Sequence, residues 1–275
     1  MGMLSLLLIS IPVGFLGALT GLGGASILIP ILVSFGIPVK EAIASGMVAI
    51  IATSSGSASS YVKEGIANVK VAMYLEMFTI IGAIAGATIT TVIPSVYLYF
   101  FFAAFLSTSF FRWGQSMKDD GVPSRGQDRI SRWLDLEGSY FDEARKQVVE
   151  YKVNNALLGG GGMLVAGLAA GMLGIGAGAF KVTVQESILR LPPKVSSTTS
   201  NFIIGMTALA GTSVYLLSGL LNLTLMGPMA VGTTIGALVG GRVLNKMRNR
   251  SLRILFFAIV AFLIAQMLYK GILSV

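Results

Sequence analysis

The chain has no cysteine and no histidine among its 275 residues, and only 12% of those residues are charged. The missing cysteine excludes disulfides, thiolate chemistry and cysteine metal sites. The missing histidine removes the commonest metal ligand and the usual proton carrier near neutral pH. A soluble domain carries roughly 25% charged residues. Because 54% of the residues are hydrophobic as well, the composition excludes a soluble globular protein, and no metal or cofactor is expected.

The apolar residues form segments that are spread over most of the chain. These segments lie at 3–19, 25–39, 42–61, 71–92, 96–111, 156–173, 178–190, 197–217, 223–241 and 254–272. The residue alternation of an outer-membrane barrel is absent, so we predict an all-α polytopic membrane protein. The net charge of +8 then reflects membrane orientation rather than nucleic-acid binding. The first segment lacks a basic leader, so a cleavable signal peptide is not expected.

The two halves of the chain resemble each other. TGLGGASILIP (20–30) matches LGIGAGAFKVT (173–183), YVKEGIAN (61–68) matches YLLSGLLN (215–222), and IGAIAGATI (81–89) matches IGALVGGRV (235–243). These ordered matches at nearly constant spacing predict an internal duplication. The first transmembrane repeat is expected at 1–111, a linker at 112–155 and the second repeat at 156–275.

The positive charges indicate how the two repeats are oriented. The first two segments of each repeat fall short of, or barely reach, the roughly 20 residues that span a bilayer. A glycine cluster separates them. If each cluster turns the chain back as a hairpin, 17 of the 20 lysine and arginine residues lie in linkers on one side. The positive-inside rule favours this arrangement over a kink in one long span. An odd number of segments per repeat then predicts inverted repeats, with the linker 112–155 in the cytoplasm.

The linker carries eight basic and eight acidic residues. Its stretch RISRWLDLEGSYFDEARKQVVEYK (129–152) is expected to form one amphipathic helix at the cytoplasmic surface, either as a connector or as a regulatory element.

The glycine clusters are candidates for an anion site. Irregular backbone survives at membrane depth only where protein buries it or water lines it. A broken helix offers free N–H groups and a positive partial charge to an anion. Close helix packing is the alternative, and we favour it for glycines spaced by four: Gly82, Gly86, Gly232, Gly236 and Gly240. The candidate anion contacts are Gly21, Gly23, Gly24, Ser26, Gly174, Gly176 and Gly178.

The stretches GFLGALTGLGGASILIPIL (14–32) and GLAAGMLGIGAGAFKV (167–182) resemble the sulfite exporter TauE/SafE family of membrane permeases. The likeness covers both hydrophobic halves. It implies transport of small sulfur-containing anions, such as sulfite or organosulfonates, across a prokaryotic cytoplasmic membrane. One departure is that the proline after the first cluster, Pro30, is matched in the second half by Thr183.

Ionisable residues at membrane depth cost about 2.5–3.5 kcal/mol and are functional candidates by default. The Lys181 ammonium is a candidate partner for a sulfite or sulfonate oxygen, with a structural salt bridge or snorkelling as the alternative. Glu76 is a candidate carrier of a coupling proton, or else the structural partner of a basic residue.

Hydroxyl and amide groups crowd the segments 44–60 and 195–213. Most such side chains simply join helices, but four begin their segments where the hairpins are expected to dock. These substrate-binding candidates are Ser45, Thr199, Ser200 and Asn201. Asn68 and Asn222 follow a glycine at a segment start and are expected to be helix caps.

The leading hypothesis is a secondary transporter, an exporter in the sense of the family, that binds its anion between the two glycine turns near mid-membrane and alternates access. An anion channel on the same scaffold is the alternative. An enzyme is not expected, since no carboxylate pair shows a catalytic spacing, and no nucleotide-binding motif of the form GxxxxGK[ST] occurs. The expected surroundings are the lipid bilayer and a small anionic substrate.

Overall fold

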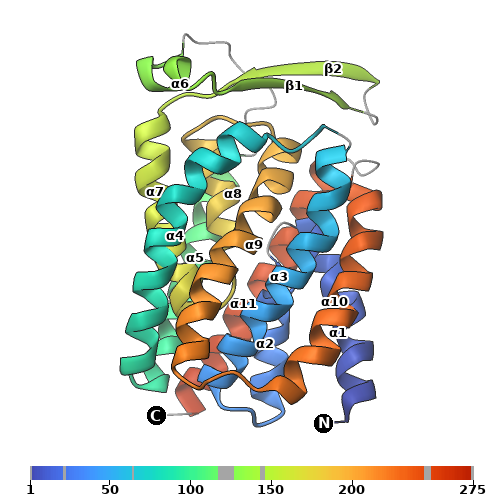
Figure 1. The fold of residues 1–275 in the computed structure, drawn as a ribbon, viewed down its shortest axis with the longest axis vertical. Helices are drawn as coiled ribbons and strands as arrows, with labels where there is room; N and C mark the ends of the chain where they lie inside the picture. The colour runs from blue at the N-terminus through green and yellow to red at the C-terminus, as the bar shows by residue number, and fades with distance from the viewer. Residues whose placement is uncertain are drawn as a thin grey trace.

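The computed structural model describes residues 2–20, 23–63, 65–116, 127–142, 146–244 and 249–273. Within these ranges the chain is mostly helical (Figure 1). The helices are α1 (Met3–Thr20), α2 (Ala25–Ser34), α3 (Val39–Lys63), α4 (Val69–Val92), α5 (Ser95–Ser116), α6 (Arg129–Trp133), α7 (Ala156–Leu173), α8 (Gly178–Ser187), α9 (Pro193–Leu217), α10 (Leu223–Leu244) and α11 (Asn249–Leu273). The strands are β1 (Glu137–Asp142) and β2 (Gln147–Lys152).

The predicted all-α membrane class is confirmed. Each predicted apolar segment corresponds to one helix, from α1 to α5 and from α7 to α11. By length and composition, four of the described helices are able to cross a membrane, namely α4, α7, α9 and α10. The helices α1 and α2 and part of α5 are apolar but shorter.

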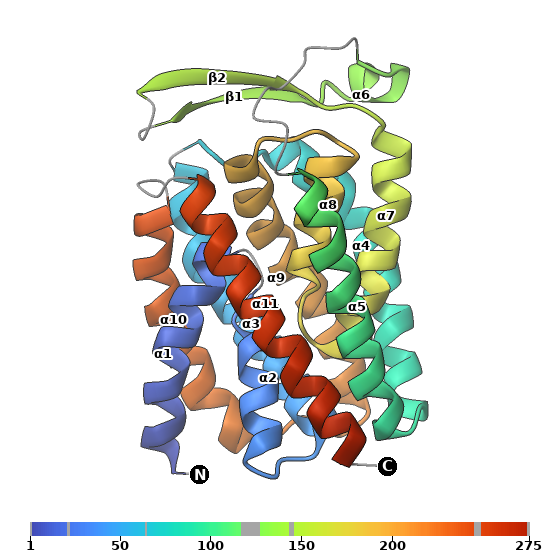
Figure 2. The same cartoon turned by 180° about the vertical axis from the view of Figure 1, so that it is seen from behind.

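The helix pair α1 and α2 starts from one end of the bundle, and the pair α7 and α8 starts from the other. Figures 1 and 2 show that α1 rises from the end where both termini lie and that α2 returns to that end. At the opposite end α7 descends from beneath the strands, and α8 returns toward them. This arrangement supports an inverted duplication, which stays a prediction.

Helix α1 of the first half packs along α10 of the second half, and α4 of the first half packs along α7 of the second half. Glycines allow both crossings. A Cβ on Gly82 would lie 2.2 Å from Leu164 O, and a Cβ on Gly236 would lie 1.9 Å from Ile11 O. The packing interpretation of these glycines is therefore confirmed. The two contacts also occupy corresponding positions of the two sequence repeats.

The linker does not form the expected amphipathic helix, and that prediction is wrong. A five-residue helix, α6, is followed by an antiparallel hairpin in which Glu137 pairs with Lys152 and Asp142 with Gln147. Along β1, burial of side chains alternates toward the end of the strand, with Tyr140 and Asp142 facing inward. Aromatic and β-branched residues favour strands when one face can be buried, and here the end of the bundle buries it.

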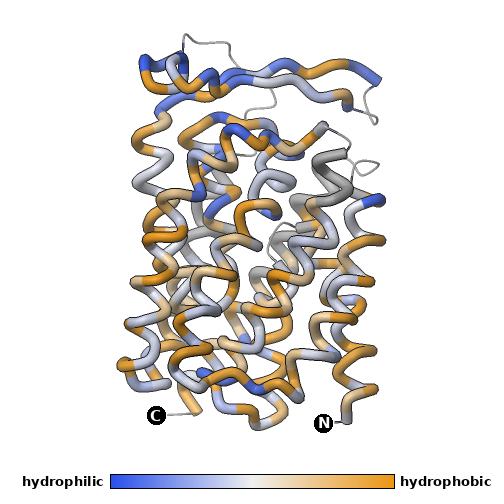
Figure 3. The backbone as a smooth tube through the Cα atoms, viewed as in Figure 1, coloured by the Kyte–Doolittle hydropathy of each residue, from blue (hydrophilic) through white to orange (hydrophobic). Residues whose placement is uncertain are grey.

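Polar contacts attach the hairpin to the helices. The Lys194 ammonium at the start of α9 donates to Asp142 Oδ1 at 2.7 Å, with both side chains almost fully buried. Asn68 Nδ2 donates to Tyr151 Oη at 3.0 Å. A lone two-stranded hairpin is marginally stable in water, so these contacts explain why it persists. Figure 3 shows hydrophilic residues in this linker, above a bundle that is largely hydrophobic and carries further hydrophilic residues near its two ends.

Candidate functional site

Both glycine clusters are turns at which one helix stops and a short helix begins. In the first cluster Gly23 has a φ of 71°; in the second, Gly174 and Gly176 have φ values of 63° and 67°. Only glycine adopts such angles without steric cost, so the turns themselves require these residues. Ala177 takes a φ of 50°, which stores a modest strain at the start of α8. Gly21 lies outside the described residues.

The two turns touch each other. Ser26, at the start of α2, donates from Oγ to Gly23 O at 3.1 Å. The same hydroxyl lies 3.5 Å from Ile175 O, which belongs to the second cluster. The sequence therefore predicted correctly that both clusters are interruptions, and the structure brings these interruptions together.

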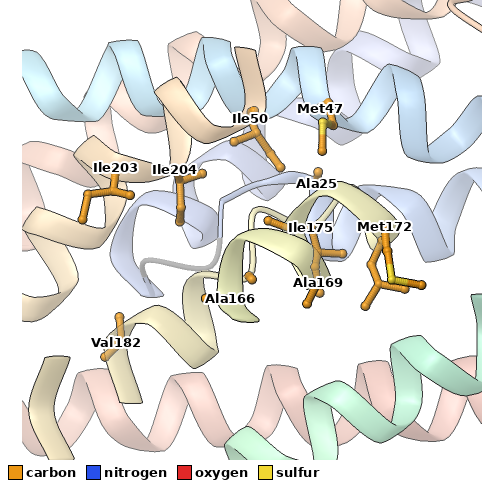
Figure 4. Close-up of a cluster of buried hydrophobic side chains, with 14 of the residues drawn as sticks. Ala25, Met47, Ile50, Ala166, Ala169, Met172, Ile175, Val182, Ile203 and Ile204 are labelled. Carbon is orange, nitrogen blue, oxygen red and sulfur yellow. The ribbon is translucent and has the colours of Figure 1, made fainter. Parts of the chain in front are cut away.

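Two isoleucines, Ile50 on α3 and Ile204 on α9, lie against both turns (Figure 4). A Cβ on Gly23 would be 3.4 Å from a side-chain carbon of each isoleucine. A Cβ on Gly176 would be 2.8 Å from Ile204 and 3.3 Å from Ile50. The turns thus share an apolar support. Their own backbone and the Ser26 hydroxyl are the polar groups that they can offer to an anion.

Two of the other predicted glycines adjoin the turns, and two predicted serines are buried without a partner in the described chain. Gly24 precedes α2, where a Cβ would lie 3.1 Å from Thr53 Oγ1, and the buried Gly178 is the first residue of α8. Ser45 and Ser200 are fully buried, and their hydroxyls have no hydrogen-bond partner within the described ranges. An unpaired hydroxyl in an apolar interior costs free energy. Both serines therefore keep capacity for a ligand.

Asn201 hydrogen-bonds to the carboxyl end of the broken helix α1. Its Nδ2 donates to Ala18 O at 3.0 Å, near the last turn of α1. Tyr215 Oη donates to Gly171 O at 2.6 Å, near the last turn of α7. The final carbonyl groups of a helix lack partners within it. Side chains from α9 therefore satisfy the carbonyl ends of both broken helices.

Thr199 lies at the linker end of the bundle rather than at the turns. Its Oγ1 accepts from Asn68 N at 3.2 Å. Asn68 in turn accepts from Val71 N at 3.0 Å, which confirms it as the cap of α4. Burial raises the pKa of Tyr151, the hairpin residue bonded to Asn68, so its hydroxyl stays neutral. The four hydroxyl and amide candidates thus occupy different places.

Lys181 and Glu76 belong to one buried cluster. The Lys181 side chain is fully buried, and its Nζ donates to Thr207 Oγ1 at 2.8 Å. Thr207 Oγ1 lies 3.3 Å from Glu76 Oε1 and 3.2 Å from Thr79 Oγ1. The cluster joins α8, α9 and α4. A buried cation needs a compensating charge, and Glu76 supplies it through the threonine.

The sequence interpretation missed Thr207, Thr79 and Gln185. Glu76 Oε2 and both polar atoms of the Gln185 carboxamide have no partner in the part of the chain that the structure describes. The two threonines were recognisable in principle, because the repeat alignment pairs each with a threonine of the other half. Gln185 carried one signal, an amide within an apolar segment, four residues after Lys181.

Comparison with known proteins identifies the family. The family described as sulfite exporter TauE/SafE matches residues 6–267. The chain is 23% identical over 282 residues to a Bacillus subtilis protein described as "Probable membrane transporter protein YunE", covering all of both chains. It is 26% identical over 249 residues, 89% of each chain, to "Probable membrane transporter protein YdhB" of the same organism. No solved structure matches the chain.

Proposed function

The chain belongs to the sulfite exporter TauE/SafE family of membrane transporters, and we propose that it exports a small sulfur-containing anion such as sulfite or an organosulfonate. It is a permease and not an enzyme. The observation that supports an anionic substrate is the buried Lys181, one helical turn beyond the second glycine turn. A cation removed from water attracts an anion far more strongly than an exposed one does.

In this proposal the anion binds beside the two touching turns. Backbone groups of the turns and the hydroxyls of Ser26, Ser45 and Ser200 would contact its oxygens, while Lys181 would compensate its charge. Because these side chains are buried, an anion reaches them only when helices separate on one side. That requirement supports alternating access by the two repeats, with Glu76 as the candidate carrier of a coupling proton.

The proposal places the protein in a prokaryotic cytoplasmic membrane, with the linker 112–155 in the cytoplasm. The absence of cysteine makes this directly testable with single cysteines. Trp133, in the linker, and Leu217, at the other end of α9, are 82% and 89% exposed. A membrane-impermeant thiol reagent should modify Trp133→Cys in inside-out vesicles and Leu217→Cys in intact cells. The reverse pattern would place the linker outside.

The transport itself is tested with purified protein in proteoliposomes. Labelled sulfite or sulfonate should enter saturably and be accelerated by unlabelled anion on the other side. Lys181→Ala and Ser45→Ala should weaken binding of the same anion. Ionic currents at channel rates would favour an anion channel instead, and no flux of any sulfur anion would exclude the proposed substrate class.

A further inference from the structure

Gln185 on α8 is buried without any polar partner. Its side chain is fully buried, and neither atom of the carboxamide is hydrogen-bonded within the described ranges. A carboxamide carries two N–H donors and one carbonyl acceptor. Leaving them unpaired in the interior costs free energy, and native proteins rarely do so. Such a group is expected where a ligand supplies the missing bonds.

Helix α9, against which α8 packs, has further unused hydrogen-bonding capacity. Gln185 follows Lys181 by four residues, so both side chains leave α8 on the same face. Helix α8 packs against α9. On α9, Ser197 and Ser200 are three residues apart and have buried hydroxyls without a partner in the described chain. The Lys181 ammonium also reaches α9, where it donates to Thr207.

The other repeat shows that the fold does not require these polar groups. In the repeat alignment Leu28 and Leu32 of α2 correspond to Lys181 and Gln185 of α8. Both leucines are fully buried, as their counterparts are. A broken helical hairpin is therefore built with apolar side chains in one half and with an ammonium and a carboxamide in the other. Packing of the hairpin therefore does not by itself account for the polar pair.

We propose that Gln185 and Lys181 together hold the transported anion, and that this anion is a singly charged oxyanion bearing a hydroxyl group. This rests on the proposed function, since it names the ligand of the same transporter. The Gln185 amide donates to an anion oxygen, while its carbonyl accepts from the hydroxyl. When Glu76 carries the coupling proton, Lys181 compensates one negative charge, so a monoanion is neutralised whereas a dianion would leave one uncompensated charge in the membrane interior.

Two sources share this chemistry, hydrogensulfite and a hydroxyalkylsulfonate. The experiment compares isethionate with ethanesulfonate, which differ by one hydroxyl, and includes hydrogensulfite and sulfate, using purified full-length protein. The wild type should bind isethionate at least about tenfold more tightly than ethanesulfonate, because ethanesulfonate leaves the carbonyl unpaired. Sulfate should bind most weakly. Binding of hydrogensulfite with failure of both sulfonates would identify the inorganic anion as the source.

The decisive variant is Gln185→Met, which removes both polar atoms at similar volume. It should bring the isethionate preference close to one, or abolish hydrogensulfite binding if that is the ligand. It should also raise the thermal unfolding temperature of the empty protein, because unpaired polar atoms leave the interior. Leu32→Met, which places methionine at the corresponding position of α2, is the matched control. It should change neither the preference for isethionate nor the binding of hydrogensulfite.

The outcomes are distinct. Unchanged affinities in Gln185→Met overturn this proposal while leaving the transporter function intact. A lowered unfolding temperature of Gln185→Met with the ligand preference retained also overturns this proposal, because that result gives Gln185 a structural role. If wild-type protein binds no sulfur anion at all, both the proposed function and this proposal fail.

Discussion

The sharpest test of the packing replaces glycine at the two corresponding helix crossings. A Cβ on Gly236 would lie 1.9 Å from Ile11 O, whereas ordinary contact begins near 3.4 Å. Gly236→Ala therefore forces the backbones of α1 and α10 apart by about 1.5 Å. Gly82→Ala acts in the same way on α4 and α7, since its Cβ would lie 2.2 Å from Leu164 O. Neither contact is relieved by a side-chain rotation, because both partners are backbone atoms.

The expected magnitude follows from two opposing effects. Overpacking costs about 1–3 kcal/mol, occasionally more, and alanine returns roughly 0.5–1 kcal/mol of helix propensity. Each variant should therefore lose up to about 2.5 kcal/mol of unfolding free energy. Gly161→Ala on α7 is the control, because a Cβ there meets nothing within 4 Å. It should be neutral or slightly stabilising.

The purified proteins are heated in the same detergent, and unfolding is monitored as the loss of monodisperse protein on size-exclusion chromatography. Both crossing variants should unfold at lower temperature than wild type, and Gly161→Ala should not. If Gly82→Ala and Gly236→Ala were as stable as Gly161→Ala, the close approach of the helix backbones would be refuted.

Three further predictions concern buried polar contacts. Lys181→Met should destabilise the protein by about 3–5 kcal/mol, because it leaves the buried Glu76 carboxylate without its cation. In thermal unfolding, the double variant with Glu76→Gln should recover most of this loss. No recovery would show that Lys181 and Glu76 do not interact. Asp142→Asn should weaken the contact with Lys194 and speed hydrogen exchange in the strands β1 and β2, while exchange in the bundle stays slow. Equal protection of the strands in both proteins would contradict this. Asn201→Leu should cost about 1–3 kcal/mol by leaving a helix-end carbonyl unpaired, and an unchanged unfolding temperature would argue against that cap.

Much of the fold was predictable because the bilayer imposes local rules. Long apolar runs predicted the helices, and glycines spaced by four predicted close crossings. The prediction for the linker was wrong because Tyr140 and Asp142 become buried only against the end of the bundle. No local sequence pattern describes that contact. An amphipathic helix was expected from the charges of that stretch alone, without the bundle surface that buries one face of the hairpin.

The candidate site was predicted in its parts but not in its connections. Lys181 and Glu76 stood out because charge is costly in a membrane, yet nothing in the sequence indicated that Thr207 would lie between them. Thr199 and Ser200 are neighbours in the sequence, but Thr199 bonds to Asn68 beneath the hairpin, whereas the Ser200 hydroxyl has no partner in the described chain. Consecutive residues of a helix face different neighbours, so their roles depend on what packs there.

The sequence by itself determined the membrane class, the helical segments and the two interruptions, because each of these follows from local composition and from the cost of unpaired backbone in lipid. Only the tertiary structure decided that the interruptions touch and that α4, α8 and α9 bring Glu76 and Lys181 together. It also left Gln185 buried without a partner in the described chain. These features depend on where helices cross, and a crossing is set by side chains far apart in the sequence.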